Sequence, residues 1–231
     1  MTNARQTARL QKFACEDSKR GISTVVVKCG IGYATDGRML VSEAMDEPCE
    51  DIVSREDGKI VPIDNMVKFS KYPDVANKWY VFPKKEFEEF ERNFKEAFRA
   101  KVVENDREYS ERYKPVMCPC CNEDLYWDTY EEKLVSKREE KQPVQLSDIS
   151  LPVRLVFPDD GFIVVNFGYV YRVANEYENV LFAMAKVEDQ NSVLLFMKTT
   201  DQKMASVLMP LRTYDSDCVR GRVATLKEAG S

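Results

Sequence analysis

The pattern of apolar and polar residues at the start of the chain predicts a helix followed by strands. Apolar residues recur at helical spacing through 4–19, with basic residues between them. β-branched and apolar runs then predict strands through 22–45, interrupted at Asp36-Gly37. Asp-Gly between apolar runs is a strong hairpin signal, because Gly accepts a positive φ and Asp bonds its own backbone. A hairpin is expected here, and its corner either only turns the chain or also faces a partner.

Two more helices are predicted by stripes of apolar side chains. In 84–101 four phenylalanines are three or four residues apart, which places them on one helical face that covers a core. A second stripe predicts a helix that contains Val170, Val173, Tyr177, Val180, Leu181 and Met184. Short apolar runs predict strands at 79–82, 153–157, 162–165, 192–197 and 205–211.

Changes in composition divide the chain into segments. The stretch 102–150 is rich in charged residues, Tyr and Gln, which is typical of an inserted module or a linker. We therefore expect a first half over 1–101, an inserted Cys-containing module over 102–150, a second half over 151–213 and a loose polar tail over 214–231.

Composition and charge narrow the class of protein. The 231 residues are 44% hydrophobic and 32% charged, with seven Cys and a net charge of −5. No apolar run reaches the ~20 residues of a membrane span, so we expect no membrane partner. An odd number of Cys favours reduced thiols and a cytoplasmic protein over a secreted one. The complete lack of His excludes Ser-His-Asp catalysis, Cys-His catalysis and His-ligated metal sites. The sequence also shows no group of carboxylates with the spacing of a hydrolase site. We therefore expect no enzyme.

Four segments in order resemble the bacterial DNA polymerase III β subunits, the sliding clamps. FACEDSKRGISTVVVKCGIGYATDGRMLV resembles the start of their middle domain, and YVFPKKEFEEF the strand-Pro-helix step that follows it. VVNFGYVYRVANEYENVL resembles a helix of their third domain, and SVLMPLR their terminus. The segments cover about half of this chain, which is too short for three such domains and continues beyond Arg212.

The resemblance implies a fold class and a role. The fold would be α+β, sliding-clamp-like, with antiparallel sheets, helices packed on one face and an inserted Cys module, in one or two clamp-type domains. The protein would act without catalysis in DNA replication or repair, as a homo-oligomer that can form a ring on DNA. The alternative is a protein-interaction adaptor of the same fold that does not encircle DNA and that uses a zinc or thiol module to bind its partner.

The resemblance also implies a docking site for replication or repair proteins. In sliding clamps the corner after the ATDG motif and the terminal Met-Pro segment form two walls of a pocket for short linear peptides. Carried over by motif, the pocket residues are Thr35, Gly37, Arg38, Leu40, Pro83, Val207, Met209, Pro210 and Leu211. The family often has His-Arg after the Gly, where this chain has Arg38-Met39, so its peptide preference can differ. The alternative is that these side chains pack inside the fold.

A basic first helix implies a second site, for double-stranded DNA. Clamp helices line a ring and meet phosphates without reading sequence. The corresponding residues are Arg5, Arg9, Lys12, Lys19 and Arg20. An ordinary solvated helix face explains the same charges.

A cysteine cluster indicates a metal or redox site. Cys118 and Cys121 have the C-x-x-C spacing of a zinc knuckle, and Cys120 lies between them. Structural zinc needs four ligands, and the chain has no second C-x-x-C. Zinc at Cys118 and Cys121 would therefore be half a site that another subunit completes; the other interpretations are a ribbon that has lost its metal and a set of redox-sensitive thiols.

Overall fold

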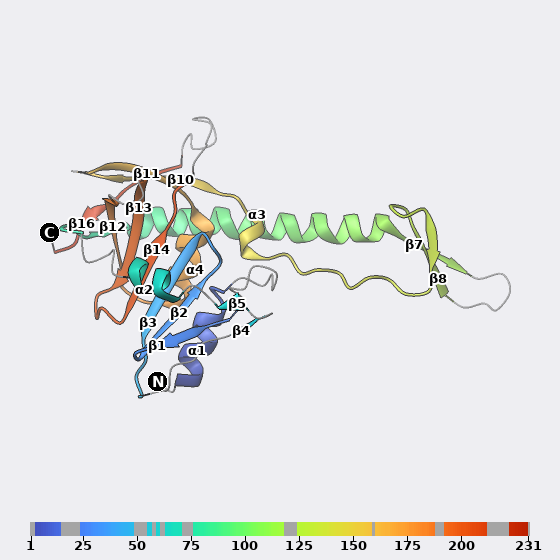
Figure 1. The fold of residues 1–231 in the computed structure, drawn as a ribbon. Coiled ribbons are helices and arrows are strands. Elements are labelled where there is room, and N and C mark those ends of the chain that lie inside the picture. Colours follow the sequence, from blue (N-terminus) through green and yellow to red (C-terminus); the bar gives the residue numbers. More distant parts are fainter. Residues whose placement is uncertain are drawn as a thin grey trace. The chain divides into compact units, whose positions relative to one another are not determined.

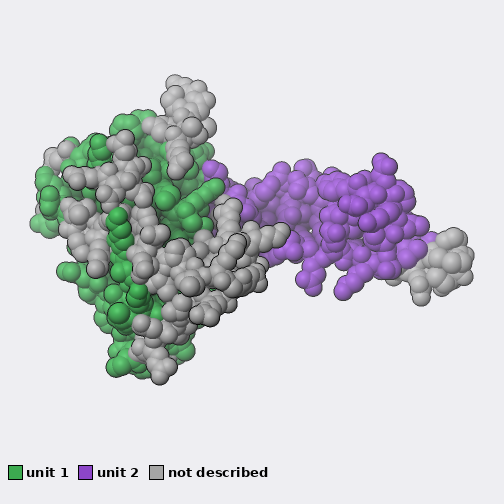
Figure 2. Space-filling model, viewed as in Figure 1, with its two compact units in different colours: residues 1–90, 151–231 green, residues 91–150 purple. Residues whose placement is uncertain are grey.

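Two compact units make up the protein (Figure 2). The computed structural model describes residues 3–14, 24–48, 55–56, 59–60, 63–70, 76–117, 124–158, 160–187, 192–211 and 222–230. The first unit comprises 1–90 and 151–231, and the second comprises 91–150. The first unit is therefore built from both ends of the chain, with the second unit between them in sequence.

An eight-stranded antiparallel sheet forms the first unit's main layer (Figure 1). Its strand order is β1-β2-β3-β14-β13-β12-β6-β16. The strands are β1 (Val26–Lys28), β2 (Ile31–Thr35), β3 (Met39–Ala44), β6 (Tyr80–Val81), β12 (Val180–Val187), β13 (Ser192–Thr199), β14 (Met204–Leu208) and β16 (Lys227–Glu228). The pairing of β3 with β14 joins the two halves of the chain that the sequence motifs define.

Helices cover both faces of this sheet. Leu40 of β3 packs with Met66 of α2 (Ile63–Ser70) on one face. On the other face lies α1 (Asn3–Gln11), which ends earlier than the 4–19 helix expected from the sequence. Leu10 of α1 comes so close to β2 that a Cβ at Gly32 would lie 2.6 Å from its Cδ1. The small hairpin of β4 (Arg55–Glu56) and β5 (Lys59–Ile60) forms a separate pair.

A second, three-stranded sheet completes the first unit. Its order is β11-β10-β15, with β10 (Pro152–Phe157) antiparallel to β11 (Gly161–Asn166) and parallel to β15 (Val223–Thr225). One face of β10 is fully buried, through Val153, Leu155 and Phe157. β11 leads directly into α4 (Phe167–Glu176), which the Asn166 side chain caps by accepting a hydrogen bond from the Gly168 N–H. The α+β class with antiparallel sheets is confirmed.

The phenylalanine stripe lies on α3 (Lys84–Arg112), which begins in the first unit and continues into the second. The rings of Phe87 and Phe90 lie 5.4 and 5.6 Å from the ring of Phe167, and Phe94 is also buried. The predicted core-facing stripe is therefore confirmed. Nowhere in the described part of the chain is a helix both long and apolar enough to cross a membrane.

The second unit adds a small sheet to the end of α3. Its order is β7-β8-β9, and the strands are β7 (Tyr113–Met117), β8 (Asp124–Asp128) and β9 (Lys133–Val135). Arg112 and Asp128 pair at 2.8 Å, and this guanidinium lowers the pKa of the Asp128 carboxyl to about 2. The return segment is held to α3 by side-chain bonds to main-chain carbonyls: the Tyr109 hydroxyl donates to Glu139 at 2.7 Å. A 3₁₀ turn, Leu146–Asp148, precedes β10.

The predicted helix through Met184 is wrong beyond Glu176. Tyr177 has extended backbone angles, Asn179 has a φ of 54°, and 180–187 is the strand β12. β12 pairs with β13 on one side and β6 on the other. Its adjacent residues Phe182 and Ala183 are both buried, so the strand shows no alternation that would distinguish it from a helix.

The expectation of a loose tail is wrong for 222–230. These residues form β15 in the second sheet and β16 at the edge of the first. Ala224 and Leu226 are almost fully buried, and the Leu226 N–H donates to the Val156 carbonyl at 2.9 Å. The segment contains few apolar residues, but Ala224 and Leu226 are both buried where the segment pairs with the two sheets.

Replacing Leu226 by Ala is expected to lower the free energy of unfolding by about 2–5 kcal/mol, because the side chain is 1% exposed and its loss leaves a cavity. Val223→Ala is the matched control, since Val223 lies in the same segment but is 45% exposed; its effect should be under about 1 kcal/mol. Chemical denaturation of both variants checks this. Equal, small effects would mean that the segment contributes nothing to the core.

Candidate functional site

The corner between β2 and β3 is held by bonds within its own residues. The Asp36 Oδ1 accepts hydrogen bonds from the N–H groups of Arg38 and Met39, each at 3.0 Å. The Thr35 hydroxyl donates to the Met39 carbonyl at 2.7 Å and accepts from the Gly37 N–H at 3.0 Å. Gly37 has a φ of 86°, which favours glycine at this position. The hairpin is confirmed, and the side chains of Thr35 and Asp36 hydrogen-bond to its main chain.

A side chain of α4, Arg172, binds this corner through Asp36. Its Nη1 donates to Asp36 Oδ2 at 3.1 Å, and both side chains are 13% exposed. Its Nη2 donates to the Lys12 carbonyl, and its guanidinium carbon lies 5.5 Å from the Phe13 ring centre. The same group lies 5.8 Å from the ring of Tyr169, whose hydroxyl pKa is raised by burial. One side chain of α4 thus connects the corner to the turn that follows α1.

The terminal Met-Pro segment lies directly beside the corner. In the β3–β14 register Leu40 is opposite Val207. The chain then continues past β14, and the Met209 N–H donates to the Arg38 carbonyl at 3.0 Å. The Leu211 N–H donates to Val164 of β11 at 2.9 Å. The structure therefore brings together two motifs that are far apart in the sequence.

The predicted pocket residues differ in exposure. Gly37, Arg38 and Met209 are exposed, and Met209 keeps 40% of its surface accessible. Thr35, Pro210 and Leu211 are half-buried. The accessible surface at this place therefore combines a backbone corner, a guanidinium and an apolar segment, which we call the corner–terminus surface (35–38 and 209–211).

Leu40 and Val207 belong to the core rather than to an open wall. Leu40 packs with Val26 and Tyr33, and Val207 with Leu194 and Phe196. The side chains of Leu40 and Val207 thus pack inside the fold, which was the alternative to a place in the pocket wall.

Pro83 is separated from the corner–terminus surface by the strand order. It follows β6, and β13 and β12 lie between β14 and β6 in the sheet. Its carbonyl accepts a hydrogen bond from the Phe87 N–H at 3.0 Å, at the start of α3. The structure thus gives Pro83 a place at a helix start.

The basic residues predicted to face DNA have different surroundings. Arg5 is exposed, whereas Arg9 pairs with Glu43 of β3 and is largely covered. Lys12 pairs with Glu176 at 2.7 Å. Lys19 and Arg20 lie outside the described residues. Of the three that are described, two therefore have a carboxylate beside them.

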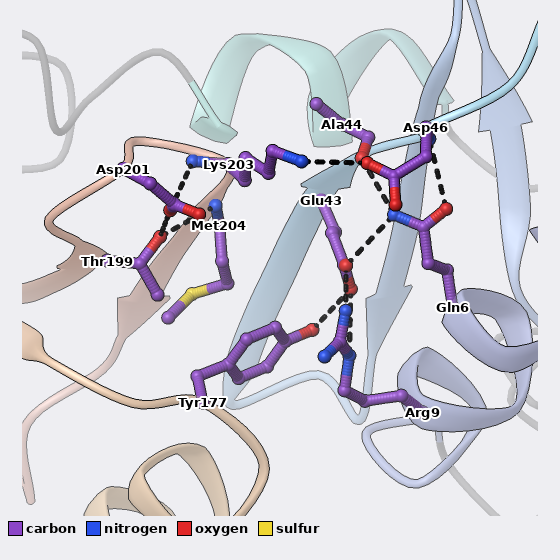
Figure 3. A network of polar contacts seen from close by, with 10 residues as sticks. All are labelled: Gln6, Arg9, Glu43, Ala44, Asp46, Tyr177, Thr199, Asp201, Lys203 and Met204. Atoms are coloured by element: carbon purple, nitrogen blue, oxygen red, sulfur yellow. Dashed lines mark hydrogen bonds and ion pairs between the residues drawn. The ribbon is translucent and has the colours of Figure 1, made fainter. Parts of the chain in front are cut away.

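Glu43 is the centre of a buried polar network (Figure 3). Its side chain is almost fully buried and accepts from Arg9, from Gln6 Nε2 at 3.1 Å and from the Tyr177 hydroxyl at 2.7 Å. Burial and the negative charge of Glu43 raise the pKa of the Tyr177 hydroxyl. A buried carboxylate is costly unless it is paired, so this network joins α1, β3 and the end of α4 in one arrangement. Periodicity in the sequence carries no signal for it.

A pocket of about 460 Å³ opens beside this network. Its lining includes Glu43, Asp46, Glu176, Tyr177, Asp201 and Lys203. Lys203 pairs with Asp46 at 2.8 Å and lowers the pKa of that carboxyl to about 2, while Asp201 accepts from the Thr199 hydroxyl. Glu43, Asp46, Glu176 and Asp201 are therefore already paired or hydrogen-bonded within the chain.

No metal centre is found in the described part of the chain, where no three Cys, Asp or Glu side chains are arranged to hold an ion. Cys118, Cys120 and Cys121 lie outside the described residues, so zinc at Cys118 and Cys121 stays a prediction.

Comparison with known proteins gives structural similarity only. No protein family matches the chain, and no curated protein matches its sequence. Similar solved structures include the β subunit from the DNA polymerase of Streptococcus pyogenes (13% identity, TM-score 0.42) and a DNA polymerase sliding clamp from Pseudomonas aeruginosa with ligand (14%, 0.43). A third is a putative DNA polymerase III β subunit from Eubacterium rectale (9%, 0.44). In each comparison 92% of this chain and 65% of the other are covered, so the chain spans less than two thirds of these proteins.

Replacing Arg172 by Ala is expected to loosen the corner, because Asp36 loses its ion-pair partner at a largely buried position. Amide hydrogen exchange at Gly37, Arg38 and Met39 should become faster, and the free energy of unfolding should fall by about 1–3 kcal/mol. Arg172→Lys should have a smaller effect, since it retains the charge.

Lys12→Ala is the control for this change, because the Lys12 side chain is 60% exposed and only its carbonyl contacts Arg172. Unchanged exchange at the corner in Arg172→Ala would show that the internal bonds of Asp36 are sufficient.

Proposed function

We propose that this protein is a non-enzymatic, sliding-clamp-like protein of DNA replication or repair that docks short linear peptides of partner proteins on its corner–terminus surface. One observation carries the proposal: the Met209 N–H donates to the Arg38 carbonyl. That bond makes neighbours of the two motifs that the resemblance to sliding clamps assigns to one peptide pocket. The β3–β14 pairing supports the same arrangement.

The physical properties of the surface suit peptide docking. The corner main chain is held by Asp36 and Thr35, so little ordering cost arises there on binding. Met209 supplies an exposed, unbranched side chain that can adapt to several apolar partners. Gly37 has no side chain and therefore leaves its backbone accessible. Arg38 adds an exposed cation to the rim.

Binding of a fluorescein-labelled peptide that carries the clamp-binding segment of a bacterial replicative polymerase tests the proposal. Met209→Ala is expected to weaken binding roughly tenfold, because it removes the exposed apolar contact of the surface. Fluorescence anisotropy gives the dissociation constants, and thermal unfolding shows that the variant is folded.

Val193→Ala is the matched control, since Val193 of β13 is 38% exposed, close to the 40% of Met209. It should bind as the wild type does. Failure of the wild type to bind, or an equal loss in the control, would contradict peptide docking on this surface.

A second candidate function is an interaction adaptor of the same fold that does not encircle DNA. The ion pairs of Arg9 with Glu43 and of Lys12 with Glu176 favour it. A Lys or Arg that contacts a DNA phosphate releases counterions condensed on the DNA, and this release drives binding. Arg9 and Lys12 already have carboxylate partners, which compete with the phosphates. The net charge of −5 adds no general attraction to DNA.

Retention of double-stranded DNA separates this adaptor from a clamp-like protein that encircles DNA. If the adaptor is correct, the protein should not be retained on DNA-agarose even at about 50 mM salt. A DNA-encircling protein should be retained at about 50 mM and released by about 200 mM salt, with weaker retention in Arg5→Ala. The second pattern would contradict the adaptor.

A further inference from the structure

Residues 222–230, which we call the strap, lie along the edges of both sheets of the first unit. β15 runs parallel to β10, where the Arg154 N–H donates to the Arg222 carbonyl at 2.9 Å. β16 runs antiparallel to β6, and the Ala229 N–H donates to the Trp79 carbonyl at 2.8 Å. One short extended segment thus hydrogen-bonds to two strands that belong to different sheets.

The side chains of the strap alternate between buried and exposed positions. Ala224 and Leu226 are 0% and 1% exposed, whereas Val223 is 45% exposed and Thr225 is also exposed. Such alternation is typical of a strand that lays one face on a protein surface. In the register with β10, Ala224 is opposite Leu155, a core residue of the second sheet. The strap is therefore held as a peptide is held in strand addition, by main-chain bonds and by alternate side chains in buried positions.

The two strands under the strap are joined to each other without it. β10 pairs with β11 and β6 pairs with β12, in each case on the side away from the strap. The Tyr80 hydroxyl of β6 donates to Asp160 Oδ2 at 2.9 Å, in the turn between β10 and β11. The Tyr80 ring also lies 5.2 Å from the ring of Phe157, edge to face. Because these contacts use no residue of the strap, the two edges border a groove that exists independently of it.

An uncovered strand edge offers N–H and carbonyl groups to any extended chain, and proteins commonly cover such edges. We propose that β10 and β6 border a strand-binding groove and that the strap is its built-in ligand, an autoinhibitory segment that keeps other extended chains out. The groove takes a small residue and, two positions later, a larger aliphatic one, as in Ala224 and Leu226. The strap of a second copy has this sequence, so a copy whose strap is released binds the strap of another.

This groove is distinct from the corner–terminus surface, because none of its residues belongs to that surface. Peptide docking at the corner is therefore not assumed, and the two proposals are tested with different peptides.

Binding of the fluorescein-labelled peptide RVATLKEAG, which has the sequence of the strap, tests the proposal on the full chain. The wild type should not bind it, because its own strap fills the groove. Leu226→Asp in the protein should release the strap, since a carboxylate is costly at a position that is 1% exposed, and this variant should bind the peptide. Val223→Asp is the matched control, because Val223 lies in the strap but is 45% exposed; it should bind no more peptide than the wild type. Fluorescence anisotropy measures the binding.

The side chains of the peptide provide a second readout. A peptide with Leu226→Asp should bind to the released protein roughly tenfold more weakly or worse, because its buried contact is lost. A peptide with Val223→Ala should change the dissociation constant by less than about threefold.

A second form of the protein keeps the native strap sequence, in case Leu226→Asp does not fold. A protease site is placed within 212–221, which lie outside the described residues, and is cut after folding. Cutting removes the effective concentration that the covalent link gives the strap. Excess labelled peptide should then exchange into the groove, and circular dichroism should show that the fold is retained.

The proposal is wrong if the cut protein takes up no peptide, since the groove would then accept no strand in trans. Unfolding of the first unit when the strap leaves would overturn it as well, because the groove would not exist without the strap. Equal binding of the peptide to the wild type and to Leu226→Asp would show that the strap does not block the groove.

Discussion

The pairing of β3 with β14 is the contact on which the first unit depends. It joins strands from before and after the second unit, with Ser42 donating to the Ala205 carbonyl across 163 positions of sequence. Closing so large a loop costs conformational entropy. The burial of Leu40 and Val207, which are opposite each other in this pairing, offsets that cost. Without this pair the eight-stranded sheet would be two separate sheets, and the corner and the terminal segment would not meet.

Two carboxylates, the buried Glu43 and the largely buried Asp36, then hold the helices on this sheet. Glu43 holds α1 and the end of α4 through Arg9 and Tyr177, and Asp36 holds α4 through Arg172. In both cases a charged group accepts several bonds at little exposure, which is the condition under which a buried charge is tolerated. The proposed docking surface is therefore held on its corner side by several hydrogen bonds, while Met209 provides an exposed, unbranched side chain.

The second unit is held together by different interactions. Its stability comes from side chains that stack on or bond to one another along α3 and one side of the small sheet, as with Arg112 and Asp128. Burial in this unit is limited: Tyr113 and Asp128 are buried, whereas Met117 and Leu134 are more than half exposed.

The sequence by itself determined the elements whose signals are local. Asp36-Gly37 specifies the hairpin through backbone conformation, and the phenylalanine spacing specifies α3, because each signal needs only neighbours a few residues away. Tertiary structure decided the rest. Residues 180–187 form a strand because β6 pairs with one side of it and β13 with the other. Residues 222–230 belong to both sheets because β15 pairs with β10 and β16 pairs with β6. Arg172 and Glu43 found their partners only in the folded chain, since no local period records which distant carboxylate or cation a side chain will meet.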